Sequence, residues 1–202
     1  MTVLAAVPIK SFASAKNRLA SHLSMPQRRL LAQLLSERVF KALSGAGAEP
    51  LALAADEDVA SWAQEKGYRV QLDSQADLNA AATSAIEIAS REGRSWLIVH
   101  SDLPHVDHRA IEIAIGAIDS GRPVIVPSQD GGTPALGWHR EQFPFAYGPA
   151  SFQRHLRHVA QDQPLVLTDP RLMFDVDRPA DLALVLASDS GLKIRLSTLV
   201  GS

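Results

Sequence analysis

Short apolar runs alternate with amphipathic segments of helical period along most of the chain, and this alternation restricts the fold more than any other feature. Apolar runs of this length are typical of buried strands, and the segments between them are long enough to form helical crossovers. Strands joined by helical crossovers run parallel. The sequence therefore predicts an α/β fold of three α/β/α layers, Rossmann-like, with a mostly parallel central sheet. The predicted strands are residues 3–7, 51–54, 68–72, 96–99, 124–126 and 165–167, and residues 172–174 are also strand-like.

Capping signals locate the predicted helices. Ser24-Met-Pro-Gln27 has the pattern of a capping box with a proline near the helix start, and that helix is expected to end near Gly45. Asp56 and Asp107 are the expected N-caps of two further helices. The remaining predicted helices are residues 76–91 and 151–161 and a last helix that begins at Pro179.

The composition is that of an ordinary soluble globular protein, because 46% of the 202 residues are hydrophobic and 21% are charged. This length fits one domain and no long linker is visible, so residues 1–202 are expected to form a single domain. The longest apolar runs are too short to cross a bilayer. The N-terminus lacks the basic start and the cleavage site of a secretory signal, so a cytoplasmic location without membrane contact is expected.

Charge and cysteine content exclude several classes of function. A net charge of -2 gives no general attraction to nucleic acid, so any site for a polyanion must be local. The absence of cysteine excludes disulfides, thiolate metal sites and cysteine nucleophiles. Neither G-x-S-x-G nor H-E-x-x-H occurs, which leaves acyl transfer and zinc proteolysis without support. Phosphoryl or nucleotidyl transfer remains.

Two acidic segments are the strongest candidates for a functional site. Asp102 follows the apolar run at residues 96–99, and a carboxylate after a buried strand lies where open α/β sheets bind ligands. Asp175 and Asp177 are two residues apart and would face the same way on a strand. Together the three carboxylates could hold a hard cation. Asp102 is equally readable as a residue that caps the turn before the following helix. Asp177 is also readable as the cap of the helix that begins at Pro179, and that role is compatible with binding a metal.

A basic loop follows the first predicted strand and contains Lys10, Lys16 and Arg18. Its position would suit nucleotide phosphates, although a local run of cations is often only a solvated surface. No glycine-rich phosphate loop of either the G-x-x-x-x-G-K-[ST] or the G-x-G-x-x-G type occurs. Side chains and a metal ion would therefore have to bind the phosphates.

The segment at residues 128–150 is rich in turns and aromatic residues and is expected to be an insertion on the acceptor side of a site. Gly131-Gly132-Thr133 and Gly148-Pro-Ala-Ser151 offer backbone N–H groups and hydroxyls that would suit an anion. Taken singly, each is more typical of a plain turn or an N-cap, and only their combination indicates a second anion site.

Asn79 and the histidine pairs are weaker candidates. Asn79 would contact a nucleotide or would be a polar residue that faces water. The pairs His105/His108 and His155/His158 have the spacing of one helical turn, but both lack an obvious third ligand. We therefore expect these histidines on the surface.

Several of these segments, taken in order, resemble a single family. They are Pro8-Ile9-Lys10, Ala15-Lys16-Asn-Arg18-Leu19, Leu78-Asn79-Ala, Ser101-Asp102-Leu-Pro104, Gly132-Thr133, Phe145-Ala-Tyr-Gly148-Pro-Ala-Ser151-Phe and Phe174-Asp175-Val-Asp177-Arg-Pro179-Ala-Asp181-Leu182. They resemble the 2-phospho-L-lactate guanylyltransferases. That family includes phosphoenolpyruvate guanylyltransferases, belongs to the nucleotidyltransferases of the molybdenum-cofactor guanylyltransferase type and serves synthesis of the deazaflavin coenzyme F-420. The resemblance extends to about Leu186.

The resemblance implies a GT-A-like nucleotidyltransferase fold and a Mg²⁺-dependent transfer of GMP from GTP to a small phosphorylated carboxylic acid, with release of pyrophosphate. The implied acceptors are 2-phospho-L-lactate, phosphoenolpyruvate and 3-phosphoglycerate. The implied site residues are Asp102, Asp175 and Asp177 for the metal, Lys10, Lys16, Arg18, Asn79 and Ser101 for the nucleotide, Thr133, Gly148 and Ser151 for the acceptor, and Asp102, Lys16 and Arg18 for catalysis.

Two positions depart from the family pattern. Pro134 stands where the family commonly has Asn after Gly-Thr, and Arg178 stands where Thr is usual before Pro. Proline has no N–H and no polar head group, so a hydrogen bond that Asn would give to the acceptor is lost and the choice of acceptor is expected to differ. Arg178 would add a cation beside the same site.

Two alternatives to a guanylyltransferase stay open at the level of the sequence. One is a related nucleotidyltransferase that uses CTP or another nucleotide, and the other is a nucleotide-binding module without catalysis. Residues 192–196 alternate apolar and basic side chains like an edge strand, which would allow pairing with a second subunit in a homodimer.

Overall fold

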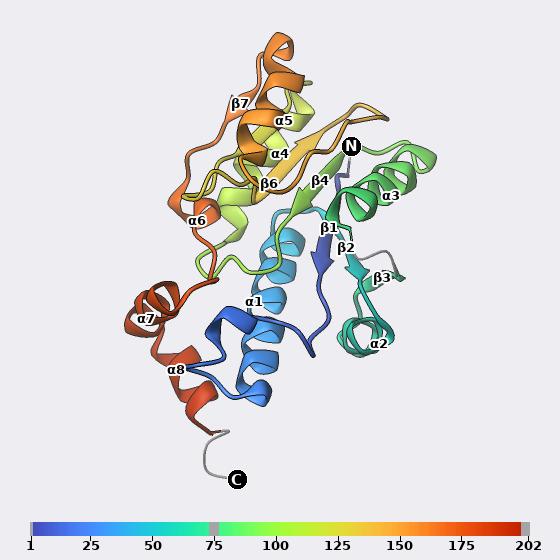
Figure 1. Cartoon of the computed structure of the whole chain (residues 1–202). Coiled ribbons are helices and arrows are strands. Elements are labelled where there is room, and N and C mark those ends of the chain that lie inside the picture. The colour runs from blue at the N-terminus through green and yellow to red at the C-terminus, as the bar shows by residue number, and fades with distance from the viewer. Residues whose placement is uncertain (1, 73–76, 199–202) are drawn as a thin grey trace.

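The computed structural model describes residues 2–72 and 77–198 (Figure 1). Within these residues the chain forms a seven-stranded sheet in the order β3-β2-β1-β4-β6-β5-β7. Neighbouring strands are parallel except that β6 runs antiparallel to both β4 and β5. The predicted α/β fold with a mostly parallel sheet is confirmed. The strands are β1 (Leu4–Ile9), β2 (Glu49–Ala54), β3 (Arg69–Leu72), β4 (Trp96–Val99), β5 (Val124–Val126), β6 (Ala135–Trp138) and β7 (Leu165–Val166).

Helices cover both faces of this sheet. Alternate residues of β1 supply the two faces: Val7 belongs to a core shared with α1, α2 and α4, and Leu4 belongs to a core shared with α3 and α5. This arrangement is the predicted three-layer α/β/α architecture. The helices of these two layers are α1 (Met25–Gly45), α2 (Glu57–Glu65), α3 (Leu78–Arg91), α4 (His108–Asp119) and α5 (Ser151–Val159).

Further short helices complete the described chain. They are the 3₁₀ helices η1 (Asn17–Leu19) and η2 (Ala160–Asp162), and the α-helices α6 (Pro170–Met173), α7 (Pro179–Ser188) and α8 (Ser190–Ser197). A third, smaller core joins η1 and α1 to α7 and α8, which are drawn in red in Figure 1. Val176 is fully buried in this core. No helix within the described residues is long and apolar enough to cross a membrane.

The helix starts follow the capping chemistry that the sequence predicts. The Ser24 side chain accepts from the N–H of Gln27 while the Gln27 side chain accepts from the N–H of Ser24, so the capping box is confirmed. Asp56 and Asp107 cap α2 and α4 by accepting from backbone N–H groups. The predicted start of α3 at Ala76 lies outside the described residues, and the described helix begins at Leu78 with Asp77 as its cap.

Strand β6 is the main element that sequence reasoning misses. It lies inside the segment expected to be an acceptor-side insertion, yet it occupies the sheet between β4 and β5. Its sequence Ala-Leu-Gly-Trp follows Pro134 and contains Gly137, and glycine and proline are typical of turns. Gly137 is needed for packing, because a Cβ there would lie 2.7 Å from Ile118 Cδ1 and 2.8 Å from Leu97 Cδ1.

Two expected strands are helical instead. Residues 172–174 lie at and just after the end of α6, because Asp169 accepts from the N–H of Arg171 and Pro170 occupies the first helical turn. Residues 192–196 belong to α8, which Asp189 caps through the N–H of Leu192. The expectation of an edge strand at 192–196 is therefore wrong, and the homodimer stays a prediction without that support.

The strand order creates a topological switch point at the carboxyl ends of β1 and β4. The chain leaves β1 through α1 to reach β2 on one side, whereas β4 pairs with β1 on the other side. Open α/β sheets bind their ligands at such a switch point. The loop that carries Lys10 and Lys16 leaves β1 here, and the turn that carries Asp102 leaves β4 here.

We expect Gly137→Ala to lower the free energy of unfolding by roughly 1–3 kcal/mol, because the added methyl group overpacks a rigid interior. A matched control is Gly116→Ala in α4, where, apart from the adjacent helix backbone, no atom of the described residues lies within 4 Å of an added Cβ. Alanine in a helix is favoured over glycine by about 0.5–1 kcal/mol, so this variant should be slightly more stable than wild type. Urea denaturation measures both. Equal stability of the two variants would contradict the packing role of Gly137.

Candidate functional site

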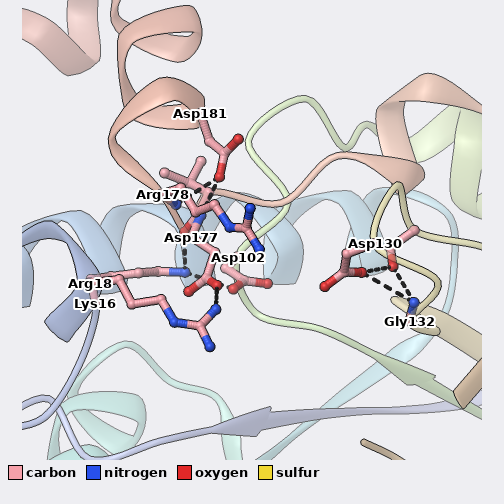
Figure 2. A network of polar contacts seen from close by, with 10 residues as sticks. Lys16, Arg18, Asp102, Asp130, Gly132, Asp177, Arg178 and Asp181 are labelled. Carbon is pink, nitrogen blue, oxygen red and sulfur yellow. Dashed lines mark hydrogen bonds and ion pairs between the residues drawn. The ribbon is translucent and has the colours of Figure 1, made fainter. Parts of the chain in front are cut away.

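A single lysine connects three parts of the chain at the switch point. Lys16 Nζ donates to Asp102 Oδ2 at 2.7 Å and to the carbonyl oxygen of Val176 at 2.6 Å (Figure 2). The Lys16 side chain is only 9% exposed. Its backbone is left-handed, with φ 53° and ψ 35°, a conformation that costs a non-glycine residue about 1 kcal/mol or more. The loop after β1 thus accepts backbone strain to bring this ammonium to Asp102.

Asp102 has one oxygen paired and the other free. Oδ2 is bound by Lys16, whereas Oδ1 is buried and has no hydrogen-bond partner within the described residues. Burial opposes ionisation, but the charges of Lys16 and His100 outweigh it, so the pKa of Asp102 lies below its usual value. Asp102 is therefore an ionised carboxylate with one unsatisfied buried oxygen.

Asp175 and Asp177 lie in an irregular segment between α6 and α7 rather than on a strand. Burial of Val176 between them orients this segment, and its N–H donates to the carbonyl oxygen of Asp102 at 3.2 Å. Burial, together with the charges of Asp102 and Asp130, raises the pKa of Asp175 to about 6. Asp177 instead forms an ion pair with Arg18. The two carboxylates thus lie in different surroundings, because Asp177 is paired with Arg18 and Asp175 is buried near other carboxylates, contrary to the simple same-face expectation.

The carboxylates are a reasonable donor set for Mg²⁺, which prefers oxygen ligands. A divalent cation would satisfy Asp102 Oδ1 and would relieve the repulsion that raises the pKa of Asp175. Residues 2–72 and 77–198 contain no group of three or more acidic or histidine side chains that is already arranged as a metal site. Binding of Mg²⁺ by Asp102, Asp175 and Asp177 together stays a prediction.

The other residues predicted to bind the nucleotide differ in their exposure and in their partners. Lys10 is exposed just after β1, and its charge contributes to lowering the pKa of Asp102. Ser101 lies in the turn that follows β4. Arg18 is 68% exposed and paired with Asp177. Asn79 already has a hydrogen-bond partner, because its Oδ1 accepts from the N–H of Tyr147 at 2.7 Å. This bond holds residues 143–149, the aromatic loop.

Thr133 and Ser151, both predicted to bind the acceptor, are brought together by the fold. Their hydroxyl oxygens lie 3.1 Å apart and both residues are buried. Thr133 Oγ1 also lies 3.0 Å from His155 Nδ1. His155 is fully buried, so the expectation that this histidine is on the surface is wrong, whereas His105, His108 and His158 are exposed. Gly148 has a φ of 116°, in the region that favours glycine.

Sequence reasoning also misses several unsatisfied polar atoms around the acceptor segment. Within the described residues, His100 Nε2, Tyr147 Oη and Arg154 Nε and Nη2 are buried without a hydrogen-bond partner. Arg154 Nη2 would lie 3.3 Å from a Cβ placed on Gly148. Buried polar atoms without partners are rare in folded proteins and commonly mark a place for a ligand. No local sequence signal distinguishes them from ordinary surface residues.

The turn before β6 adds a further carboxylate near the site. The Ser128 hydroxyl donates to Asp130 Oδ1, and the N–H of Gly132 donates to Ser128 Oγ at 2.6 Å (Figure 2). The Ser128 bond lowers the pKa of Asp130, as do a bond from the N–H of Gly132 to Asp130 Oδ1 at 3.1 Å and the charge of Arg178. Arg178, one of the two positions that depart from the family pattern, therefore acts on the same cluster of carboxylates.

Pro134, the other departure, has a structural place. It is buried, and its carbonyl oxygen accepts from the N–H of His100 at 2.8 Å, which continues the pairing of β4 with β6. A backbone N–H is not required of a residue that contributes only its carbonyl to this ladder. Proline is thus compatible with the fold here, and its effect on the acceptor stays a prediction.

A comparison with protein families identifies the chain. Residues 1–195 match the family model described as guanylyl transferase CofC like. This chain belongs to that family. The match covers both the basic loop after β1 and the acidic segment before α7, so the predicted family resemblance is confirmed and the chain is a member of an enzyme family.

Two curated relatives are similar over nearly their whole length. The chain is 32% identical over 190 residues to a phosphoenolpyruvate guanylyltransferase from Sphaerobacter thermophilus, covering 90% of this chain and 91% of the relative. It is 28% identical over 199 residues to a 2-phospho-L-lactate guanylyltransferase from Methanothermobacter thermautotrophicus, covering 96% of this chain and 89% of the relative. The two relatives carry the names of different acceptors.

A solved structure supports the fold. A nucleotidyl transferase from Methanothermobacter thermautotrophicus superimposes with a TM-score of 0.67 at 15% sequence identity, covering 93% of this CofC-like chain and 99% of the other. At this identity the likeness concerns the fold alone. It agrees with the nucleotidyltransferase fold that the sequence resemblance implies.

We expect Lys16→Gln to lower the free energy of unfolding at neutral pH by roughly 2 kcal/mol, because it leaves the Asp102 carboxylate buried without its cation. Arg18→Gln is the matched control, since it removes a cation from a highly exposed pair that is worth about 0–1 kcal/mol. Denaturation in urea compares the two. The tie between the three segments would be refuted if Lys16→Gln were as stable as Arg18→Gln.

His155 should make stability depend on pH. Burial, followed by the charge of Arg154, lowers the pKa of His155 to about 4 from 6.5. The unfolded chain therefore binds a proton at this residue between these values and the folded chain does not, so stability is lost as pH falls through 6.5 towards 4. We expect wild type to lose about 2 kcal/mol more than His155→Gln between pH 7.5 and 5.

The comparison with His155→Gln cancels the contribution of Asp175, whose raised pKa acts in the opposite direction in both proteins. Urea denaturation at a series of pH values gives the difference. Parallel stability curves for the two proteins would contradict a buried neutral His155.

Proposed function

We propose that this CofC-like chain transfers GMP from GTP to a small phosphorylated carboxylic acid and releases pyrophosphate, in a Mg²⁺-dependent reaction. The acceptor is 2-phospho-L-lactate, phosphoenolpyruvate or 3-phosphoglycerate, and the product would serve synthesis of coenzyme F-420. The observation that carries the proposal is the cluster at the switch point. An ionised Asp102 with an unsatisfied oxygen lies near a second carboxylate of raised pKa and beside a loop of three cations.

The reaction needs positioning more than covalent chemistry from the protein. An oxygen of the acceptor phosphate attacks the α-phosphorus of GTP in line, a new phosphorus–oxygen bond forms, and the bond to the bridging oxygen of pyrophosphate breaks. The product is a phosphoanhydride. A phosphate dianion is already a nucleophile, so no general base is required and electrostatic stabilisation should dominate.

Each part of the site has a role in this scheme. Lys10 and Arg18 are exposed in the loop that leaves β1 and would bind the triphosphate, while Lys16 holds Asp102 in place. Asp102 and Asp175, together with Asp177, would hold Mg²⁺, which when bound neutralises charge on the triphosphate. Binding of GTP would have to release Arg18 from Asp177 if this arginine is to reach a phosphate.

The acceptor would lie on the side of β6. Thr133, Ser151 and Gly148 converge there with Arg154, whose unsatisfied guanidinium nitrogens suit a carboxylate or phosphate. A site with one cationic fork and several neutral donors fits an acceptor that carries two anionic groups. The names of both curated relatives are consistent with such an acceptor.

The test of this function is pyrophosphate release with Mg²⁺, crossing GTP, CTP, ATP and UTP with phosphoenolpyruvate, 2-phospho-L-lactate, 2-phosphoglycerate and 3-phosphoglycerate. Mass spectrometry identifies the products. We expect GTP with one acceptor to be the productive pair. A productive pair with CTP would overturn the nucleotide assignment, and metal-dependent GTP binding without turnover would indicate a binding module.

We expect Asp102→Asn to lower kcat by at least roughly 100-fold with the fold intact. The substitution removes a carboxylate charge that is proposed to hold Mg²⁺, and the metal would stabilise the negative charge that develops in the transition state. Asp58→Asn is the control, since Asp58 is an exposed residue of α2 whose ion pair with Arg29 of α1 lies at the surface. Circular dichroism checks folding of both variants. A fully active Asp102→Asn enzyme would exclude the metal and catalytic roles of this residue.

A further inference from the structure

The buried polar chain beside the predicted acceptor site contains three side chains. His155 Nε2 accepts from the backbone N–H of Ala146 at 2.8 Å, and His155 Nδ1 lies 3.0 Å from Thr133 Oγ1. Thr133 Oγ1 lies 3.1 Å from Ser151 Oγ. Exposure is at most 2% for all three residues, so water does not complete these contacts freely. The direction of each hydrogen bond therefore has to be settled within the chain.

The N–H of Ala146 fixes the tautomer of His155. A backbone N–H always donates, so Nε2 must carry a lone pair, and a neutral imidazole with a bare Nε2 carries its proton on Nδ1. Nδ1 therefore donates to Thr133 Oγ1. The neutral form agrees with the low pKa that burial gives His155.

Counting protons then leaves one without a partner. The Nδ1–H of His155, the hydroxyl of Thr133 and the hydroxyl of Ser151 supply three protons, whereas the chain of three groups has only two hydrogen bonds. Neither hydroxyl has another partner among the described residues. Either Thr133 donates to Ser151 and the proton of Ser151 is left over, or Ser151 donates to Thr133 and the proton of Thr133 is left over.

The opposite tautomer would leave no hydroxyl proton over. If Nδ1 were the acceptor, Thr133 would donate to it and Ser151 would donate to Thr133, so both hydroxyl protons would be used. It is the N–H of Ala146, in the aromatic loop, that excludes this arrangement. A buried hydroxyl proton without an acceptor is costly, and such groups in native proteins usually meet a ligand.

A second unsatisfied donor lies in the same place. Arg154 precedes His155 on α5, and its Nε and Nη2 are buried next to Gly148 without a partner in the described part of the chain. Gly148 and Ser151 are joined by the hydrogen bond from the N–H of Ser151 to the carbonyl oxygen of Gly148. A surplus hydroxyl proton and two guanidinium nitrogens without partners among the described residues all need hydrogen-bond acceptors, and the oxygens of one anionic group could serve them together.

We propose that His155 is a positioning residue that forces the Thr133–Ser151 hydroxyl pair to donate one hydrogen bond outward, to an anionic oxygen of the acceptor that Arg154 also binds. This inference rests on the proposed function for the identity of the acceptor. The proton count itself depends only on the fold. His155 contacts no substrate in this scheme and acts through the two hydroxyls.

Two substitutions of His155 separate this role from simple packing. In His155→Gln the amide oxygen reaches the position of Nε2 and accepts from Ala146, and the two hydroxyls share one bond, so one proton is still left over. In His155→Asn the amide reaches only the position of Nδ1, where its oxygen accepts from Thr133, and Thr133 then accepts from Ser151. The Asn variant therefore uses up the outward proton, whereas the Gln variant keeps it.

Steady-state kinetics with the productive pair tests the role. We expect His155→Asn to raise the KM for the acceptor roughly tenfold and His155→Gln to change it little, with the KM for GTP unchanged in both. Arg154→Gln should also raise the KM for the acceptor alone. An equal rise in the Gln and Asn variants would show the proposal to be wrong. Because His155→Asn also loses the bond from the N–H of Ala146, a rise in the Asn variant alone supports the proposal only together with the measured tautomer of His155.

The tautomer is measured independently of activity. Two-bond ¹⁵N–¹H correlation spectra of the wild-type protein distinguish the two neutral forms of imidazole, and the spectrum of His155→Gln assigns the signal of His155. A proton on Nδ1 supports the proposal and a proton on Nε2 overturns it, whatever the activity.

Failure of the proposed function can be distinguished from failure of the proposed role of His155. If no nucleotide and acceptor pair reacts, the proposed function fails, and titration calorimetry with phosphoenolpyruvate alone then compares wild type with the two His155 variants. Weaker binding by the Asn variant than by the Gln variant would keep the proposal as an anion site. Equal binding, or none, would overturn it.

Discussion

The ion pair between Lys16 and Asp102 is the interaction on which the rest of the site depends. Its ammonium also binds the carbonyl oxygen of Val176, so one cation joins the loop after β1, the turn after β4 and the segment before α7. Asp102 lies 86 residues after Lys16 in the sequence, and Val176 lies 160 residues after it. Backbone strain at Lys16 and the unsatisfied oxygen of Asp102 both belong to this junction. The acidic and basic halves of the site are therefore assembled by the same contact.

Much of the fold follows from local sequence, because the parallel strands are apolar runs bounded by clear capping residues. The capping box at Ser24 and the cap at Asp107 were readable without any tertiary information. Strand β6 was not, since its glycine looks like a turn signal and is required only by the approach of Ile118 and Leu97 across the sheet. α8 was missed for a related reason, because its apolar residues Leu192 and Leu196 fit a helical spacing as well as an alternation.

The site was predictable in its residue types and less so in its contacts. Asp102 and the basic loop were expected together because both follow strands that share an edge of a parallel sheet. The different surroundings of Asp175 and Asp177 could not be predicted from their spacing. His155 was expected on the surface, although Ser151, His155 and Val159 form an i, i+4, i+8 stripe that is buried throughout. This spacing could have predicted that His155 is buried. It was missed because two of the three residues, Ser151 and His155, are polar.

The reversed direction of β6 has a consequence for how such a site can change. Because β6 runs against β4, the residues that precede it reach the same edge of the sheet as the residues that follow β1 and β4. Thr133 and Asp130 thus lie in the connection between the antiparallel strands β5 and β6 rather than in a helical crossover. Insertions, deletions or substitutions before β6 can reshape the part of the site predicted to bind the acceptor, while the crossovers that position the part predicted to bind the nucleotide keep their length. One reversed strand makes the two halves of the site separately adjustable.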